Sequence, residues 1–232
     1  MQIACKTDVG KRRKQNEDSC AVSKSYAIVA DGMGGHNKGE IASRMAVDIL
    51  SECFENAHAC TAEQVTQAIR KANKAIFGKS KTEPECAGMG TTVVAAVWND
   101  KKIVVAHVGD SRCYEIYNGE IRLVTKDHTL VQTLLDEGKI SGKEAENYPD
   151  KHIITRAVGT DPSESPDVTE LAREKDKWLI LCSDGLTNHV GEDSILACIE
   201  NNAEPQTVAD RLVDMANAGG GLDNITVVAV KF

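Results

Sequence analysis

Aromatic residues are scarce in this sequence, and several motifs that mark common functions are absent. Phe, Trp and Tyr make up 4% of the 232 residues, so a core must be built mainly from Val, Ile, Leu and Ala. No apolar run approaches the roughly 18 residues of a membrane-spanning helix. The sequence also lacks a Walker phosphate-binding loop, a dinucleotide-binding glycine fingerprint and the G-x-S-x-G elbow of serine hydrolases.

A net positive charge is missing as well. The chain carries 27 basic and 35 acidic residues, a formal net charge of −8, which argues against a nucleic-acid-binding protein that neutralises many phosphates. One local basic run, Lys11-Arg12-Arg13-Lys14, stands against this background.

The eight cysteines form no C-x-x-C pair, which excludes the usual zinc-ribbon and thioredoxin patterns. No secretory signal precedes them, because charged residues follow at once after Met1-Gln-Ile-Ala-Cys-Lys. We therefore expect a cytoplasmic protein whose thiols are reduced and mostly buried.

Hydrophobic periodicity predicts strands and helices in separate blocks. Strands are expected at 21–30, 91–98, 102–108, 112–117, 121–124, 167–174, 177–182 and 224–231. Helices are expected at 39–55, 61–77, 129–137, 192–201 and 205–217. Thr61 and Gln64 form a candidate capping box, and Asn118-Gly119 is a strong hairpin signal.

Strands that follow one another directly favour antiparallel pairing and an α+β fold over a doubly wound one. No linker or repeat divides the chain, so residues 1–232 are expected to form one domain. The polar stretch 138–165, broken by glycines and prolines, is too long for an ordinary connection and indicates a functional loop or flap.

Four aspartates stand at the ends of hydrophobic runs. Asp31 ends the run from Tyr26, Asp110 follows Ile103–Gly109, Asp184 follows Trp178–Ser183, and Asp223 precedes the run from Asn224. An ionised carboxylate at the end of a buried strand is costly unless a cation compensates it. Because all the ligands would be oxygens, the pattern predicts a Mg²⁺ or Mn²⁺ site at the rim of a sheet.

Other residues near these runs have both a functional and a plain interpretation. Arg13 can bind a phosphate through its planar fork, although a basic run is more often a solvated surface and Arg12 could take its place. In Asp31-Gly-Met-Gly-Gly-His36, Gly32 lets its carbonyl approach a cation, or the segment is only a turn between strand and helix. His36 could be a general acid or a structural histidine. His107 is expected in the core, and His128 beneath the site or holding a loop.

Together these segments resemble the metal-dependent type 2C Ser/Thr protein phosphatases, in their compact bacterial branch. The matching motifs are Arg13-x-x-Asn16-Glu17-Asp18, Asp31-Gly-Met-Gly-Gly-His36, Gly90-Thr-Thr92, Val108-Gly-Asp-Ser-Arg112, Asp127-His128, Ser183-Asp-Gly185 and Asp223-Asn-Ile-Thr226. They occur in the family's order, and the match extends from Thr7 to Val230. The resemblance implies a four-layer α-β-β-α sandwich of two antiparallel sheets flanked by helix pairs, with residues 138–160 as the flap.

The resemblance also implies roles for single residues. Asp31 would bridge two Mn²⁺ or Mg²⁺ ions, with the Gly32 carbonyl on one of them, and Asp184 and Asp223 would complete the first. Asp110, with Asp184, would hold a weaker third ion. Further roles are implied for Asp18 in holding a metal-bound water, Arg13 in gripping the substrate phosphate, and His36 as acid. Animal relatives carry their acid histidine directly after Asp-Gly, where this chain has Met33.

The implied activity is hydrolysis of phosphoserine and phosphothreonine in proteins by a metal-activated water, reversing a Ser/Thr kinase that would itself be among the substrates. A monomer without nucleic-acid partner or membrane span is expected. The alternatives are a catalytically silent phosphatase-like binding module and a stress-pathway phosphatase acting on one phosphoserine regulator. The complete set of carboxylates argues against the first, and the lack of room for a sensor domain argues against the second.

Overall fold

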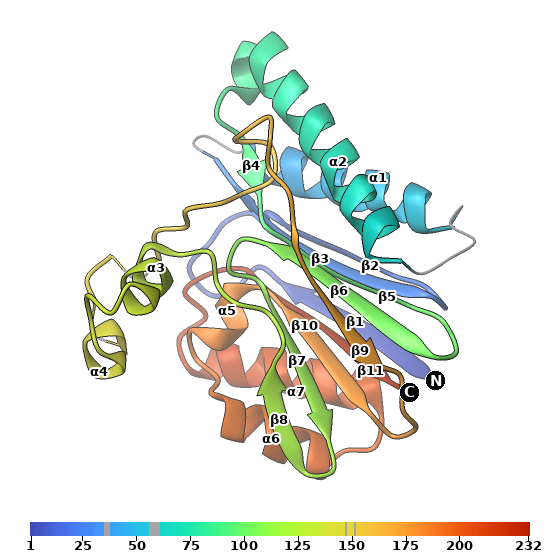
Figure 1. Ribbon diagram of the computed structural model, residues 1–232. Coiled ribbons are helices and arrows are strands. Elements are labelled where there is room, and N and C mark those ends of the chain that lie inside the picture. Colours follow the sequence, from blue (N-terminus) through green and yellow to red (C-terminus); the bar gives the residue numbers. More distant parts are fainter. Residues whose placement is uncertain (35–37, 56–60, 147, 151) are drawn as a thin grey trace.

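Two antiparallel sheets form the centre of the protein in the computed structural model (Figure 1). The structure describes residues 1–34, 38–55, 61–146, 148–150 and 152–232. The first sheet has the strand order β1-β11-β10-β7-β8. Its strands are β1 (Gln2–Asp8), β7 (Arg112–Tyr117), β8 (Glu120–Leu123), β10 (Trp178–Cys182) and β11 (Ile225–Lys231). Because β1 pairs with β11, the two chain termini lie side by side.

The second sheet has the order β2-β3-β5-β6-β9, with the short β4 also paired to β3. Its strands are β2 (Asp18–Val22), β3 (Tyr26–Met33), β4 (Gly90–Thr91), β5 (Val93–Trp98), β6 (Lys102–Val108) and β9 (Asp167–Ala172). β5 is buried at every position. A strand covered on both faces needs apolar residues on both, which is why its sequence reads as a continuous apolar run.

Helices cover the outer face of each sheet. α1 (Gly39–Glu55) and α2 (Ala62–Thr82) pack on the second sheet, and the short 3-10 helix Pro84–Cys86 follows them. α5 (Asp184–Thr187), α6 (Glu192–Glu200) and α7 (Pro205–Ala218) pack on the first sheet. In β3, Tyr26, Ile28 and Ala30 point to the helices, whereas Ala27 and Val29 point to the other sheet. This alternation builds three apolar layers, so the predicted α-β-β-α sandwich is confirmed.

Local signals place several element ends where the sequence predicted them. The hydroxyl of Thr61 accepts a hydrogen bond from the Gln64 N–H and caps α2. Asn118 and Gly119 have φ angles of 53° and 78°, as a two-residue hairpin between β7 and β8 requires.

Other elements differ from the prediction. The strand expected at 21–30 is two strands, β2 and β3, that turn where the Ser23 N–H donates to the Tyr26 carbonyl. β1 was not predicted, because Gln2–Asp8 mixes polar and apolar residues and is only partly buried. The four-residue α5 and the five-residue α4 (Gly142–Glu146) are too short to show helical periodicity. α4 and α3 (Leu130–Asp136) project to one side of the sandwich in Figure 1.

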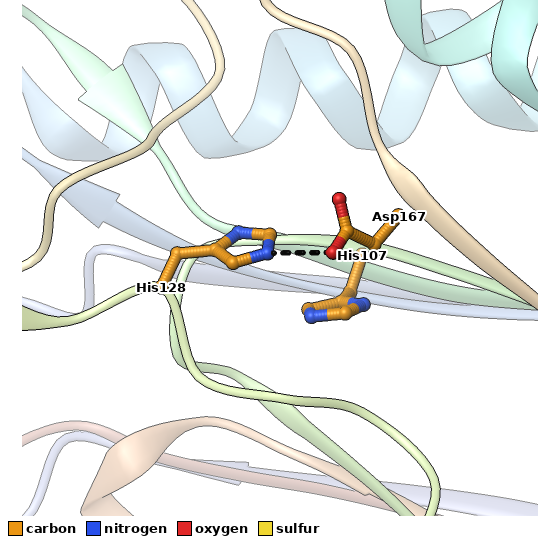
Figure 2. A group of neighbouring side chains, drawn as sticks. All are labelled: His107, His128 and Asp167. Atoms are coloured by element: carbon orange, nitrogen blue, oxygen red, sulfur yellow. Dashed lines mark ion pairs between the residues drawn. The ribbon is translucent and has the colours of Figure 1, made fainter. Parts of the chain in front are cut away.

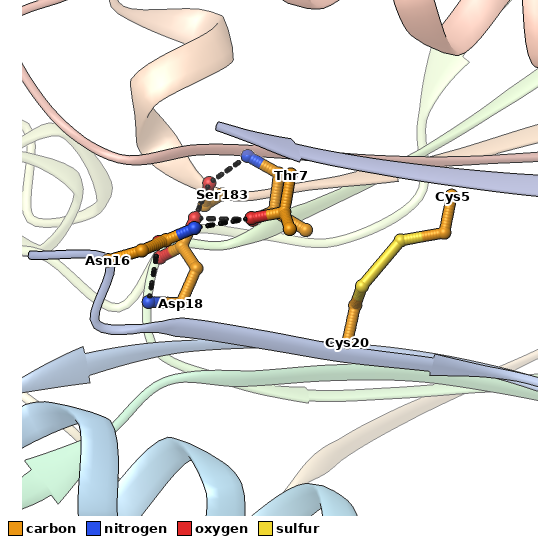
Figure 3. Close-up of a disulfide and its surroundings, with 7 residues drawn as sticks. Cys5, Thr7, Asn16, Asp18, Cys20 and Ser183 are labelled. Atoms are coloured by element: carbon orange, nitrogen blue, oxygen red, sulfur yellow. Dashed lines mark hydrogen bonds between the residues drawn. A yellow bond between two sulfur atoms is a disulfide. The ribbon is translucent and has the colours of Figure 1, made fainter. Parts of the chain in front are cut away.

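The cysteines correct one expectation. Cys5 in β1 and Cys20 in β2 form a disulfide that links the two sheets, as Figure 3 shows, so the prediction of reduced thiols is wrong for this pair. Nothing in their sequence spacing reveals that β1 and β2 lie beside each other in different sheets. Of the free cysteines in the described residues, Cys53 is partly exposed and the other four are buried as expected, namely Cys86, Cys113, Cys182 and Cys198.

No helix in the described ranges is both long and apolar enough to cross a membrane.

Candidate active site

The aspartates singled out in the sequence meet at one edge of the two sheets. Asp18 begins β2 and is the direct partner of Asp31 in the β2–β3 ladder. Asp110 lies two residues beyond the end of β6, and Asp184 begins α5 two residues beyond the end of β10. Asp223 lies just before β11. Adjacent antiparallel strands bring the start of one beside the end of the next, which gathers these residues at a single rim.

A cavity of about 280 Å³ contains most of the predicted site residues. It is lined by Arg13, Glu17, Asp31, Gly32, Met33, Gly34, Thr92, Asp110, His152, Ile154, Asp184 and Asp223. Of the predicted residues, Asp18 lies beneath this cavity's lining, and His36 lies outside the described residues.

The crowded carboxylates oppose one another's ionisation. Burial, reinforced by the charges of Asp18, Asp184 and the other neighbours, raises the pKa of Asp31 well above its usual value. Burial and then the charge of Asp223 raise the pKa of Asp184. Burial, with the charge of Asp184, raises the pKa of Asp110 to about 7. Full ionisation of this cluster therefore requires added positive charge.

Three buried carboxylate oxygens are left without a hydrogen-bond partner among the described residues, and two of them belong to the acidic cluster: Oδ1 of Asp18 and Oδ1 of Asp184. The third is Oε2 of Glu40. The other oxygen of Asp18 accepts hydrogen bonds from Ser183 Oγ at 2.8 Å and Thr226 Oγ at 2.6 Å. Figure 3 shows this buried contact between Asp18 and Ser183. Burial raises the pKa of Asp18 to about 6. Unpaired oxygens in an all-oxygen donor set suit a hard divalent cation such as Mn²⁺ or Mg²⁺.

Gly32 allows two backbone segments to approach closely at this edge. A Cβ atom at this position would overlap the backbone of Gly39 and of Glu17. The Gly32 N–H donates to the Glu17 carbonyl at 3.1 Å. No larger residue fits here, so the start of α1 is held directly against the acidic edge.

Arg13 is the basic residue of the cavity lining that pairs with the acidic cluster. Its Nη2 lies 2.7 Å from Oδ2 of Asp223, and its side chain is 50% exposed. Asn224 fixes the loop that carries Arg13, since its amide nitrogen donates to the carbonyls of Val9 and Gln15 at 3.0 and 2.9 Å. The guanidinium is therefore at the site and open to solvent, where it can meet an incoming anion.

A second cavity, of about 400 Å³, extends the site toward α3 and α4. It shares Asp110, His152 and Asp184 with the first cavity. The remaining lining residues are Arg112, Asp127, Thr129, Val131, Gln132, Leu135, Ala145, Thr187 and Asn188. A bridge between Thr129 and Ile154 ties the two ends of the projecting segment together beside this cavity.

His107, His128 and Asp167 form a separate group, which is drawn in Figure 2. The two imidazole rings stack with centroids 4.6 Å apart. His128 Nδ1 accepts from the Gly109 N–H at 3.1 Å, and its Nε2 faces Asp167 Oδ2 at 3.3 Å. The guanidinium of Arg156 lies 2.8 Å from the same Nε2, which opposes a metal ion there. The group instead supports Gly109, next to Asp110, and confirms the structural roles predicted for both histidines.

Sequence reasoning missed several residues of the site. His152 lines both cavities but gave no signal in the sequence. Thr92 belonged to a recognised motif without a role, and its Oγ accepts from the Asp31 N–H at 3.0 Å while contacting Ser111 Oγ at 2.7 Å. Thr92 therefore links the strand of Asp31 to the turn of Asp110.

The order and geometry of these residues agree with the comparisons with known proteins. The model of the protein phosphatase 2C family matches residues 10–216. The chain belongs to the protein phosphatase 2C family. It is 40% identical to the serine/threonine phosphatase stp of Listeria monocytogenes (strain F2365), with 100% of this chain and 96% of that protein covered. It is 38% identical to the serine/threonine protein phosphatase PstP of Mycobacterium tuberculosis, covering 98% of this chain and 44% of that protein.

Solved structures of Ser/Thr phosphatases have the same fold as this chain. The crystal structure of Mycobacterium tuberculosis PstP/Ppp superposes with a TM-score of 0.94 at 36% identity, covering 100% of this chain and 98% of that one. A structure of the PstP catalytic domain in complex with 2 manganese ions gives a TM-score of 0.90 at 36% identity, covering 99% and 97%. The protein is thus a protein-serine/threonine phosphatase, and phosphoproteins are its substrates.

The raised pKa values predict that metal affinity depends on pH. Asp110 has a pKa of about 7, and burial also raises the pKa of Asp31, so a cation bound by these carboxylates would displace protons from them. Mn²⁺ affinity should therefore rise from pH 6 to pH 8, by up to about tenfold per pH unit for each proton released. In the metal-free protein, the raised pKa of Asp110 also links the free energy of unfolding to pH. Its contribution to stability is fully present below the pKa that this carboxyl has in the unfolded chain, and it is lost as pH rises through about 7.

Calorimetric Mn²⁺ titrations in buffers with different ionisation enthalpies would count the released protons. We expect more protons released at pH 6 than at pH 8. A dissociation constant that stays the same across this range would contradict the prediction.

Proposed function

We propose that this phosphatase hydrolyses phosphoserine and phosphothreonine in the acidic cavity, with two Mn²⁺ or Mg²⁺ ions held by Asp31, the Gly32 carbonyl, Asp184 and Asp223. The observation that carries the proposal is the convergence of these oxygen donors on one cavity, with a buried Asp184 oxygen unpaired. When bound, the ions would supply an activated water and offset charge on the phosphate.

The chain's own residues would position the substrate and the water. Arg13 would exchange its contact with Asp223 for the substrate phosphate, because a planar guanidinium can bind two phosphate oxygens. Asp18, fixed by Ser183 and Thr226, would orient a water through its unpaired oxygen. A Ser or Thr alkoxide is a poor leaving group, so an acid should protonate it. The assignment of that role to His36 stays a prediction.

A third, weaker ion is part of the proposal. Asp110 and Asp184 line both cavities, and the charge of Asp184 raises the pKa of Asp110, which supports one site between them. With few protein ligands, an ion there would keep several waters and bind weakly.

The proposal also extends to the enzyme's domain organisation, substrates and location. Residues 1–232 would form one catalytic domain, with residues 138–160 as a flap beside the second cavity. A Ser/Thr kinase would be among the phosphoprotein substrates of a monomeric, cytoplasmic enzyme without nucleic-acid partners. A catalytically silent module is the less favoured alternative, because every carboxylate that the proposed reaction needs is present.

The direct test is hydrolysis of a phosphothreonine peptide in Mn²⁺. The rate is measured as phosphate released, with and without a chelator. We expect turnover with Mn²⁺ and none when the chelator is in excess. Undiminished turnover in chelator would rule out the proposed mechanism.

Arg13→Ala should weaken substrate binding more than it slows the reaction. Loss of a charge-assisted contact to phosphate should raise KM for a phosphothreonine peptide by about tenfold, with a smaller loss in kcat. Steady-state kinetics would separate the two constants. Arg44→Ala, on the exposed face of α1, is a control for loss of a surface arginine. An unchanged KM for Arg13→Ala would count against its role as a phosphate ligand.

A further inference from the structure

Three cations beside Arg13 have no role in the proposed reaction. In a chain of net charge −8, Lys11, Arg12 and Lys14 surround Arg13 in one exposed run. Arg13 pairs with Asp223, but no carboxylate in the described ranges forms an ion pair with the other three. A basic run is usually a solvated surface, so its relevance depends on whether the structure holds it in a defined place.

The loop that carries these cations is fixed against the acidic edge. Gly10 adopts a φ of +77°, and its Cα packs so closely on the backbone of Asp223 that a Cβ would overlap it. The Lys11 N–H donates to the Gly221 carbonyl at 2.8 Å. At the other end of the loop, the Glu17 N–H donates to Asn224 Oδ1 at 2.8 Å. The cations therefore keep their place relative to Asp223.

A hollow of about 390 Å³ opens on this loop, lined by Arg13, Lys14, Gln15 and Glu17. Arg13 and Glu17 also line the acidic cavity, so the two spaces adjoin. Lys14 and Gln15 offer N–H donors to a bound group, whereas the Glu17 carboxylate points toward Gly39, which packs on Gly32 in the lining of the acidic cavity. An anion in the hollow would therefore be drawn to the lysine side.

We propose that Lys11, Arg12 and Lys14 form a second anion subsite, which binds a phosphoryl or carboxylate side chain next to the phosphoresidue being hydrolysed. The inference rests on the proposed function, because it takes Arg13 as the ligand of the reacting phosphate. In an extended peptide, residues two apart point to the same side about 7 Å from each other. A substrate segment with an anionic residue two positions away would thus place one anion at Arg13 and the other at the neighbouring cations.

The test compares phosphothreonine peptides that differ at one position. The residue two places before or after the phosphothreonine is a second phosphothreonine, Glu or Gln, and initial rates of hydrolysis of the central phosphothreonine give kcat/KM in Mn²⁺. The variants are Lys14→Ser and the triple variant Lys11→Ser, Arg12→Ser and Lys14→Ser. Lys175→Ser is the matched control. It removes an exposed lysine that lies just before β10, whereas Asp184 and the acidic edge lie beyond the other end of that strand.

For the wild type we expect kcat/KM about fivefold higher for the anionic peptides than for the Gln peptide at low salt, and a smaller ratio at high salt. The triple variant should bring that ratio within about twofold of unity, whereas Lys175→Ser should retain it. If only the peptide with the second phosphothreonine is preferred, the subsite binds a phosphoryl group. If the Glu peptide is preferred equally, the subsite accepts either anion.

Two results would overturn the inference. One is a wild-type enzyme that hydrolyses the Gln peptide as well as the anionic peptides, and the other is a preference that survives in the triple variant. If no peptide is hydrolysed in Mn²⁺, the proposed function fails and the inference fails with it, which separates this outcome from the first two.

Discussion

Asp31→Asn should abolish turnover and leave the metal-free protein at least as stable as the wild type. Asp31 is the buried centre of the acidic cluster, and burial together with four neighbouring carboxylates raises its pKa. The same crowding that would favour a bound cation makes the ionised form of Asp31 unfavourable without one. Replacing the carboxylate by an amide removes a ligand charge and relieves the repulsion. We expect kcat to fall by at least about a hundredfold.

The opposite signs of the two effects make this prediction specific. Phosphate release from a phosphothreonine peptide gives the rate, and thermal unfolding with chelator at pH 8 gives the stability. Asp48→Asn, on an exposed position of α1, is the matched control and should change neither quantity. A large loss of stability in Asp31→Asn would indicate a structural role, and retained turnover would remove Asp31 from the metal site.

The sequence predicted the elements whose physical signals are local. α1 has an apolar stripe at Ala42, Ala46 and Leu50, and its observed bounds, Gly39–Glu55, are the predicted ones. The strands buried on both faces appeared as apolar runs, and aspartates at their ends predicted a common acidic edge. That reasoning works because a charge at the end of a buried strand is costly and thus needs a compensating partner.

The features that escaped prediction depend on contacts between distant segments. β1 has a mixed sequence and becomes a strand by pairing with β11 at the other end of the chain. The Cys5–Cys20 disulfide requires β1 and β2 to lie beside each other in different sheets. His152 reaches the site only through the course of the segment that follows α4. No periodicity or spacing within the chain encodes such placements.

Asp18 shows how the acidic edge separates two kinds of carboxylate. It pairs with Asp31 in the ladder, but one of its oxygens is committed to Ser183 and Thr226. Asp31, Asp110, Asp184 and Asp223 instead line the open cavity. The sequence motif grouped Asp18 with Arg13, yet the fold places Arg13 at the surface and Asp18 underneath. This division supports an orienting role for Asp18 and a ligand role for the four others.

Asp110→Asn should slow turnover while leaving two ions bound at Asp31, Asp184 and Asp223. Asp110 enters from the turn after β6, shares both cavities with Asp184, and has a pKa raised to about 7 by burial and by that neighbour. It lies on the side of the site that opens toward α3, so a carboxylate there can hold an ion beyond the two central ones. We expect kcat to fall by about ten- to a hundredfold.

The decisive measurement pairs a crystal structure of Asp110→Asn in excess Mn²⁺ with its rate under the same conditions. If Asp110 is one of few protein ligands of the proposed outer ion, its loss should empty that position even at high Mn²⁺, while the two central ions stay bound. Asp110→Glu is the matched variant, since it keeps the charge and should retain part of the rate. If Asp110→Asn holds three ions, or loses all of them, then the outer and central ions are not separate sites and Asp110 does not act through an ion of its own.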